Sequence, residues 1–159
     1  MSADGTITCV SKTLSANDLG MTGSHQSGIC IPKEPELLRF FPQLDENDHN
    51  PDCELSVRVS QTGGCHILRY IHYNGKLSGR STRDEYRLTR TTELFRAVEP
   101  EPGDQLEFCR CPSGEIEVTL TRRGPSVPVM SPEVPTGRVE LNGGWTVFHV
   151  EVGRHGQTR

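Results

Sequence analysis

Features of secreted and membrane proteins are missing from this sequence. No stretch approaches the roughly 20 consecutive apolar residues that span a membrane, and residues 1–5 have neither a basic flank nor an apolar run. We therefore expect a cytoplasmic protein with no leader and no membrane partner. Apolar residues make up only 33% of the 159 residues and aromatic residues 6%, so we expect a modest core.

Long helices are also unexpected, because 16 glycines and 11 prolines interrupt the chain. Alternating apolar and polar residues predict strands instead, and Asn142-Gly143 between two such runs is typical of a hairpin turn. The predicted fold class is mainly β with one or two short helices, arranged as a small closed or half-closed barrel. The expected strands are residues 6–12, 29–31, 53–60, 65–73, 84–88, 105–111, 115–122, 138–141 and 145–152, and the expected helices are residues 36–41 and 93–98.

The domain organisation follows from a proline-rich stretch near the C-terminus. Four prolines between residues 124 and 136 predict a linker. Residues 1–123 then form the main domain, and residues 137–159 form a C-terminal β-hairpin and tail. We expect the hairpin around Trp145 to pack against the barrel, with dimerisation as the alternative role.

The six cysteines lack the two-residue spacing of a zinc knuckle or ribbon. Cys109 and Cys111 share one face of a predicted strand, which suits two small buried side chains as well as two metal ligands. We expect no metal and no cofactor. In a reducing compartment all six cysteines are expected to be free thiols.

A catalytic constellation is missing as well. Asp52 and Glu54 resemble a carboxylate nuclease motif, but no lysine follows at the required spacing. His49 lies in an acidic turn without metal-ligand partners at helical spacing, and His25 has serine neighbours but no third group to complete a triad. The predicted class is therefore not an enzyme, and a small Mg²⁺-dependent nuclease is kept as the alternative.

A uniform excess of positive charge is also absent, since the net charge is −4. Its distribution is uneven: residues 69–96 hold seven basic and three acidic side chains, whereas residues 34–54 and 99–117 are strongly acidic. One basic segment is thus set between acidic ones. A second alternative function, a protein-interaction barrel that binds a basic partner through the acidic segments, follows from this pattern.

Two long polar segments, residues 12–31 and 74–90, interrupt otherwise regular strands; we call them the first arm and the second arm. Their side chains match the hydrogen-bonding groups of base edges, because Arg pairs with guanine, Asn and Gln with adenine, and Glu with cytosine. Other side chains suit phosphates. The candidate DNA-binding residues are Asn17, His25, Gln26, Arg80, Arg83, Glu85 and Arg87 for bases, Lys12, Ser15, Ser24, Lys76, Ser81, Thr82 and Arg90 for phosphates, and Asp18, Asn74, Asp84 and Tyr86 beside them.

Both arms carry specific motifs. The first is Lys12-Thr-Leu-Ser-Ala-Asn-Asp-Leu-Gly-Met-Thr-Gly-Ser-His-Gln-Ser-Gly-Ile-Cys-Ile-Pro32, and the second is Tyr73-Asn74 followed by Gly79-Arg-Ser-Thr-Arg-Asp-Glu-Tyr-Arg-Leu-Thr-Arg90. In order and spacing they resemble the two arms of the N-terminal domain of EcoRII-type restriction endonucleases. The resemblance covers roughly residues 10–122.

This resemblance implies a DNA-binding pseudobarrel, related in fold to a plant transcription-factor domain. Such a domain grips the major groove between its arms and reads a short C/G-rich site of the CC(A/T)GG type. The resemblance places Arg83, Glu85 and Arg87 at base-reading positions and turns His25 toward DNA. Ser81 and Tyr86 stand where the family's second arm has lysines, so the base preference of this chain is expected to differ.

The family's catalytic centre lies in a separate, larger domain, and nothing in this chain is long enough to form one. We therefore expect a stand-alone module that recognises a specific double-stranded DNA sequence. It would serve a restriction or modification-sensing system. A separate nuclease subunit is the candidate protein partner.

Overall fold

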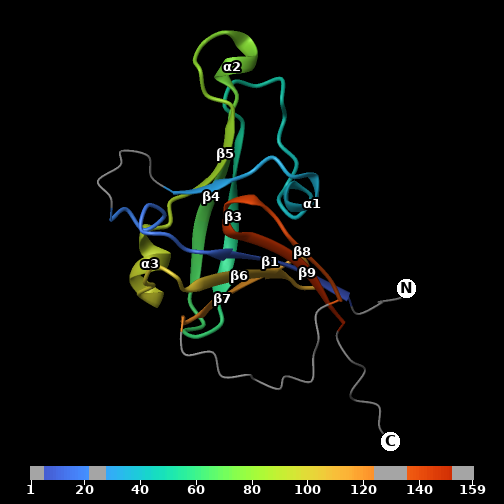
Figure 1. The fold of residues 1–159 in the computed structure, drawn as a ribbon. Coiled ribbons are helices and arrows are strands. Elements are labelled where there is room, and N and C mark those ends of the chain that lie inside the picture. The colour runs from blue at the N-terminus through green and yellow to red at the C-terminus, as the bar shows by residue number, and fades with distance from the viewer. Residues whose placement is uncertain (1–5, 22–27, 124–135, 152–159) are drawn as a thin grey trace, which may run out of the picture.

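The structure, a computed structural model, describes residues 6–21, 28–123 and 136–151 (Figure 1). Its strands form one nine-stranded sheet in the order β2-β5-β4-β3-β7-β6-β1-β9-β8. The strands are β1 (Thr6–Thr13), β2 (Ile29–Ile31), β3 (Asp52–Val59), β4 (Cys65–Tyr73), β5 (Glu85–Thr89), β6 (Gln105–Arg110), β7 (Ile116–Thr121), β8 (Thr136–Glu140) and β9 (Trp145–Glu151), and the helices are α1 (Pro35–Leu38), α2 (Gly75–Ser78), α3 (Thr92–Val98) and the 3₁₀ turn η1 (Asn142–Gly144).

The sheet rolls into a half-open barrel. β5, β4 and β3 run steeply across β7, β6 and β1 in Figure 1. The change of direction occurs where Val57–Val59 of β3 pair in parallel with Ile116–Val118 of β7, whereas the other strand pairs described are antiparallel. This arrangement confirms the mainly β fold with short helices and the pseudobarrel architecture.

The core fills the inside of this roll. Buried and exposed residues alternate along β3: Leu55, Val57 and Val59 are buried while the residues between them face outward, as the two-residue period of a strand requires. Buried side chains from the strands and from helices α1 and α3 join one cluster, whose largest fully buried members are Trp145, Tyr70, Phe108, Leu14, Ile29, Ile31, Leu37, Leu68, Leu88, Leu94 and Leu106.

The C-terminal hairpin belongs to the same sheet. β9 pairs with β1 over seven residues, and β8 pairs with β9. Trp145 is 1% exposed, and its indole N–H donates to the carbonyl of Cys30 in β2 at 3.0 Å. The hairpin around Trp145 therefore packs into the core, and the Asn142-Gly143 turn lies where the sequence predicts it.

The predicted helix at residues 36–41 is shorter, since α1 ends at Leu38. The second arm, read from sequence as a loop, contains the single helical turn α2. Gly79 ends α2 in the left-handed conformation that favours glycine, with φ of 77°. A side chain on Gly75 would overlap that of Ser81. The arm is therefore compact.

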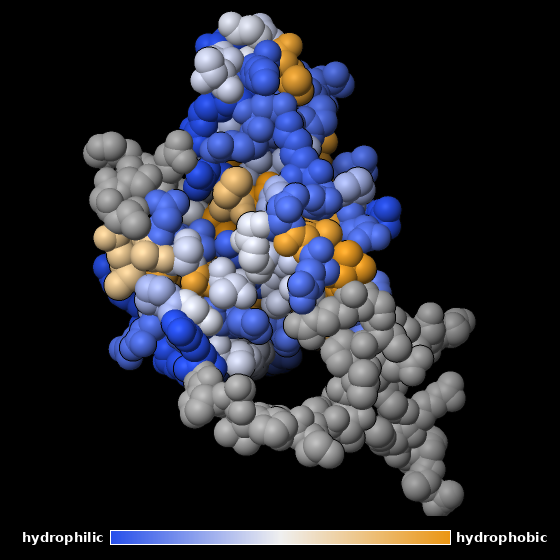
Figure 2. Space-filling model, in the orientation of Figure 1, coloured by the Kyte–Doolittle hydropathy of each residue, from blue (hydrophilic) through white to orange (hydrophobic). Residues whose placement is uncertain are grey.

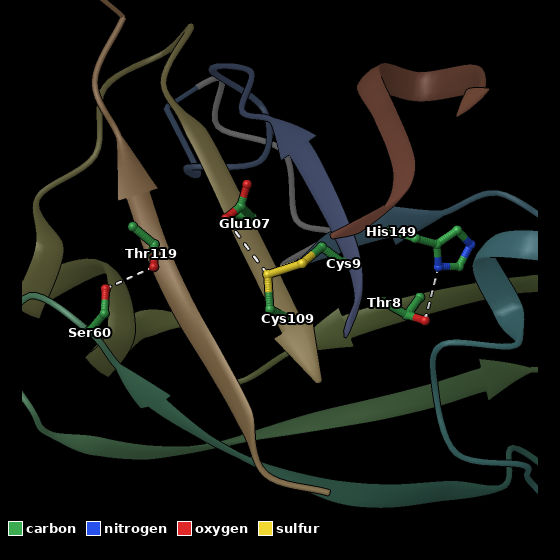
Figure 3. Close-up of a disulfide and its surroundings, with 7 residues drawn as sticks. All are labelled: Thr8, Cys9, Ser60, Glu107, Cys109, Thr119 and His149. Carbon is green, nitrogen blue, oxygen red and sulfur yellow. Dashed lines mark hydrogen bonds between the residues drawn. A yellow bond between two sulfur atoms is a disulfide. The ribbon is translucent and has the colours of Figure 1, made fainter. Parts of the chain in front are cut away.

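The expectation of six free thiols is wrong for two of them. Cys9 of β1 and Cys109 of β6 form a disulfide (Figure 3). The two residues are register partners on neighbouring antiparallel strands, with their Cα atoms 4.1 Å apart. The sequence separation of 100 residues hides this pairing until the strand register is known. The other four cysteines are free.

Candidate functional site

The second arm protrudes from the sheet as a continuation of β4 and β5 (Figure 1). Its base is fixed by Asn74, which is 5% exposed. The backbone N–H of Asn74 donates to the side chain of Asn50, and the backbone N–H of Asn50 donates to the side chain of Asn74. The Asn74 amide also donates to the carbonyl of Asp48 at 2.8 Å. Asn74 thus attaches the arm to the acidic turn at residues 44–51 and is not presented at the surface.

The tip of the second arm carries exposed polar and basic side chains, and hydrophilic residues dominate the protrusion in Figure 2. Lys76, Arg80, Ser81 and Thr82 are all exposed. The backbone N–H of Arg80 donates to Gly75, and that of Lys76 donates to Arg83, each at 2.9 Å. These bonds hold the backbone of the tip while the two cationic side chains point to solvent.

Arg83, Glu85 and Arg87 alternate along the extended segment that leads into β5, and their side chains meet on one face of it. We call this the reading face. Glu85 accepts hydrogen bonds from Arg83 at 2.6 Å and from Arg87 at 2.7 Å. Burial raises the pKa of Glu85, but the hydrogen bonds and charges of both arginines outweigh burial, so the pKa lies below its ordinary value. The carboxylate is therefore charged.

The two arginines of the reading face differ in exposure. The side chain of Arg87 is 7% exposed and also donates to the carbonyl of Gly28 in the first arm. That of Arg83 is 38% exposed and lies over the ring of Tyr73, 3.7 Å from its centroid. The Nε–H of Arg83 is buried and has no acceptor within the described part of the chain. A ligand can therefore reach only the exposed part of this side chain while it stays over Tyr73.

The opposite face of the same segment carries Asp84 and Tyr86, which contact His72 of β4. We call Asp84, Tyr86, His72, Glu46 and Lys33 the brace. The imidazole of His72 is stacked on Tyr86, with centroids 4.0 Å apart. Its two nitrogens lie 2.7 Å from a carboxylate oxygen of Glu46 and 2.9 Å from one of Asp84.

Two further contacts complete the brace. Lys33 pairs with the second carboxylate oxygen of Asp84, and the hydroxyl of Tyr86 donates to Glu46 at 3.3 Å. Hydrogen bonds from Lys33 first, and then from His72, lower the pKa of Asp84. Burial, followed by the charge of Glu46, raises the pKa of Tyr86 to about 12. Tyr86 therefore remains a neutral donor.

The first arm is described up to residue 21 and again from residue 28. Ser15 and Asp18 cap each other, since each side chain accepts a hydrogen bond from the other's backbone. Lys12 is buried, pairs with Asp18 at 3.3 Å and donates to the carbonyl of Gly143. Asn17 is exposed. The predicted residues Ser24, His25 and Gln26 lie outside the described residues.

The C-terminal end of the first arm, residues 28–31, lies against β5 of the second arm. Gly28 has a φ of 93°, and a side chain there would collide with the carbonyl of Leu88 in β5. β2 follows directly and pairs with β5, so that Cys30 is opposite Arg87. Glycine thus allows the end of the first arm to lie against the strand that carries the reading face.

The remaining candidates lie apart from the arms' reading face. Arg90, 56% exposed, pairs with Glu54 at 3.4 Å, and Asp52 pairs with Arg69 at 2.6 Å. Within the described ranges, no group of three or more His, Cys, Asp or Glu side chains is placed to hold a metal ion. No helix in those ranges is long and apolar enough to cross a membrane.

Sequence reasoning missed Tyr73, which supports Arg83, and the part that His72, Glu46 and Lys33 play behind the arm. His72 is a buried histidine of β4. Its partners Glu46 and Asp84 come from two other segments and could not be paired without the fold, in which His72 is opposite Tyr86 and Tyr73 is opposite Glu85.

Comparison with known proteins relates this chain to restriction enzymes. Residues 3–118 match the family model described as "Restriction endonuclease EcoRII, N-terminal". The chain is 40% identical over 85 residues to the type II restriction enzyme EcoRII of Escherichia coli, a match that covers 52% of this chain and 20% of the relative. The match therefore spans only a minor part of the relative's length.

A solved structure supports the fold. The B3 domain of the UbaLAI restriction endonuclease, crystallised with its cognate DNA, superposes with a TM-score of 0.50 at 22% sequence identity. The superposition covers 75% of this chain and 70% of that domain. The pseudobarrel predicted from the resemblance is thus a fold of the B3 type.

Proposed function

Because this chain belongs to the family of EcoRII restriction endonuclease N-terminal domains, we propose that it binds double-stranded DNA sequence-specifically. The structurally similar B3 domain is seen with its cognate DNA, which supports the proposal. In this proposal the two arms enter the major groove. The chain recognises the DNA, and a separate subunit or domain carries the nuclease activity.

The reading face carries the proposal. Arg83 has a partly exposed side chain whose guanidinium is positioned over Tyr73. A guanidinium held in one plane can donate two parallel hydrogen bonds to the O6 and N7 atoms of guanine. Glu85, held as a carboxylate between two arginines, is suited to accept from the amino group of cytosine. These pairings fit a site rich in C and G.

The tip and the arm ends supply contacts to phosphates. Lys76 and Arg80 are exposed at the tip, Ser81 and Thr82 offer hydroxyls beside them, and Arg90 follows the far end of β5. Cations that neutralise phosphates release counterions, so binding weakens steeply with salt. Lys12 and Asp18 form a buried ion pair that supports the first arm from the protein side. Asn17 lies at the surface of this arm.

Fluorescence anisotropy with labelled duplexes tests this proposal. We expect a duplex with one CC(A/T)GG site, or a close C/G-rich variant, to bind at least tenfold more tightly than a scrambled duplex of equal composition. The logarithm of the affinity should fall linearly with the logarithm of the salt concentration. Equal, weak binding of both duplexes would contradict sequence-specific recognition.

The same protein incubated with plasmid DNA and Mg²⁺ tests the assignment as a non-catalytic module. We expect intact plasmid. Cleavage that is lost on Asp52→Ala would instead support the compact-nuclease alternative, because Asp52 belongs to the carboxylate motif considered from the sequence.

A further inference from the structure

We propose that His72 is a positioning residue that couples DNA affinity to pH by holding the second arm in place only while its imidazole is protonated. This inference rests on the proposed DNA binding and concerns the brace, on the opposite side of the strand from the reading face. The imidazole of His72 does not touch the reading face itself, so its effect is exerted through the backbone of the arm.

The hydrogen bonds of His72 indicate its charge state. Both ring nitrogens lie within hydrogen-bond distance of carboxylate oxygens, those of Glu46 and Asp84. A carboxylate oxygen only accepts, and a neutral imidazole carries a single N–H. Both contacts are hydrogen bonds only when the ring carries two protons. With both carboxylates ionised, the imidazolium form is the one that satisfies both contacts at once.

The charges around the ring are balanced in this form. The titratable groups facing His72 are Glu46 from the acidic turn, Asp84 and Tyr86 from the second arm, and Lys33 behind Asp84. With Tyr86 neutral, two carboxylates face two cations. Loss of the imidazole proton to solvent leaves one negative charge in excess and turns one hydrogen bond into a contact between two lone pairs.

The brace is connected directly to the reading face. Asp84 lies between Arg83 and Glu85 in the chain, so a displacement of Asp84 moves the backbone of both. His72 also joins β4 to two other segments: its backbone N–H donates to Pro51 at 3.0 Å and its ring contacts Glu46 in the same turn, while the other ring nitrogen contacts Asp84 of the second arm. When the ring loses one partner, the root of the arm loses an attachment and the negative charge next to the DNA increases. Both changes weaken binding.

Affinity measured against pH tests the coupling. We expect wild-type protein to bind a labelled CC(A/T)GG duplex about fivefold or more tightly at pH 5.5 than at pH 8.5 at constant ionic strength. His72→Gln should bind with the affinity that the wild type has at pH 8.5, and most of the pH dependence should be gone. His66→Gln, on the same strand but outside the brace, is the matched control and should keep the wild-type profile.

His25→Gln separates this coupling from a direct contact between a protonated histidine and DNA. A pH profile that persists in His72→Gln and disappears in His25→Gln would overturn the inference. If the wild type binds no duplex at either pH, the proposed function itself fails. Those two outcomes are therefore distinguishable.

A second variant covers the case in which His72→Gln does not fold, as judged by circular dichroism. Glu46 is half-exposed, with 47% of its side chain accessible, so Glu46→Gln should leave the fold intact. It replaces one carboxylate partner of the ring with a neutral amide, which can donate to or accept from the ring nitrogen, so the difference in affinity between pH 5.5 and pH 8.5 should shrink. An unchanged profile in Glu46→Gln would count against the coupling.

Discussion

The two faces of the strand leading out of the second arm use the same kinds of side chain for different purposes. On the reading face, Glu85 is held between Arg83 and Arg87, and the side chain of Arg83 is 38% exposed. On the opposite face, Asp84 is held between Lys33 and His72, and both ring nitrogens of His72 contact carboxylates. The face with the partly exposed guanidinium is suited to bind a ligand, and the face whose groups pair with one another is suited to fix the arm.

Replacement of Arg87 should have the largest effect of the substitutions considered, because this residue belongs to the reading face and also fixes the arm. Arg87→Met removes a buried cation that binds Glu85 and the carbonyl of Gly28. Breaking a buried ion pair on one side costs about 3–5 kcal/mol. We expect urea denaturation to show a loss of that order in the free energy of unfolding, together with loss of specific DNA binding. A loss below about 1 kcal/mol in the free energy of unfolding would mean that Arg87 does not hold the arm in place.

Arg83→Ala should separate binding from stability. We expect the binding free energy for the preferred duplex to weaken by about 1–3 kcal/mol. The free energy of unfolding should change by no more than about 0.5–1 kcal/mol, since the ion pair of Arg83 is partly exposed to solvent. Anisotropy titrations and urea denaturation measure the two quantities.

Arg58→Ala is the matched control for Arg83→Ala. Arg58 is another partly exposed arginine that pairs with carboxylates, Glu115 and Glu117, and it lies on β3 away from the arms. Its loss removes the same charge, so any general electrostatic effect on DNA binding appears in both variants. Equal weakening by the two substitutions would argue against a base contact by Arg83.

Asp84→Asn should have the smallest effect and a defined pH dependence. The pKa of Asp84 is lowered in the folded protein, chiefly by the hydrogen bond from Lys33. The stability it contributes is therefore present above the ordinary aspartate pKa of about 3.9 and is lost as the pH falls through the lower, folded-state value. We expect the wild type to exceed the variant by about 1–2 kcal/mol in free energy of unfolding near neutral pH. The gap should close in acid below about pH 4, and a gap that persists there would contradict this account.

Much of the fold was predictable because local patterns carry it. The strands at 29–31 and 65–73 have the predicted bounds, since alternation and flanking Gly, Pro and Asn residues mark them. The helical turn α2 was missed because four residues are too few to show a period. The disulfide was missed because it depends on the register between β1 and β6.

The candidate site was predictable in part for the same reason. The residues of the reading face are neighbours in sequence, so their alternation and the resemblance to a known arm were enough to select them. The brace brings together Lys33, Glu46 and His72 from segments far apart in the chain, and only the fold shows that they meet. The burial of Lys12, Asp18 and Asn74 was also invisible in the sequence, because polar residues in a polar loop are ordinarily exposed.

The most direct test of the different roles of the two faces is selection of bound sequences from a randomised duplex pool, with and without cytosine methylation. Wild type, Arg83→Ala and Asp84→Asn would be compared in parallel. We expect the wild type to enrich a short C/G-rich site, Arg83→Ala to lose preference at one base position of it, and Asp84→Asn to enrich the same site as the wild type. No enrichment by the wild type, or loss of the same position in both variants, would contradict the account.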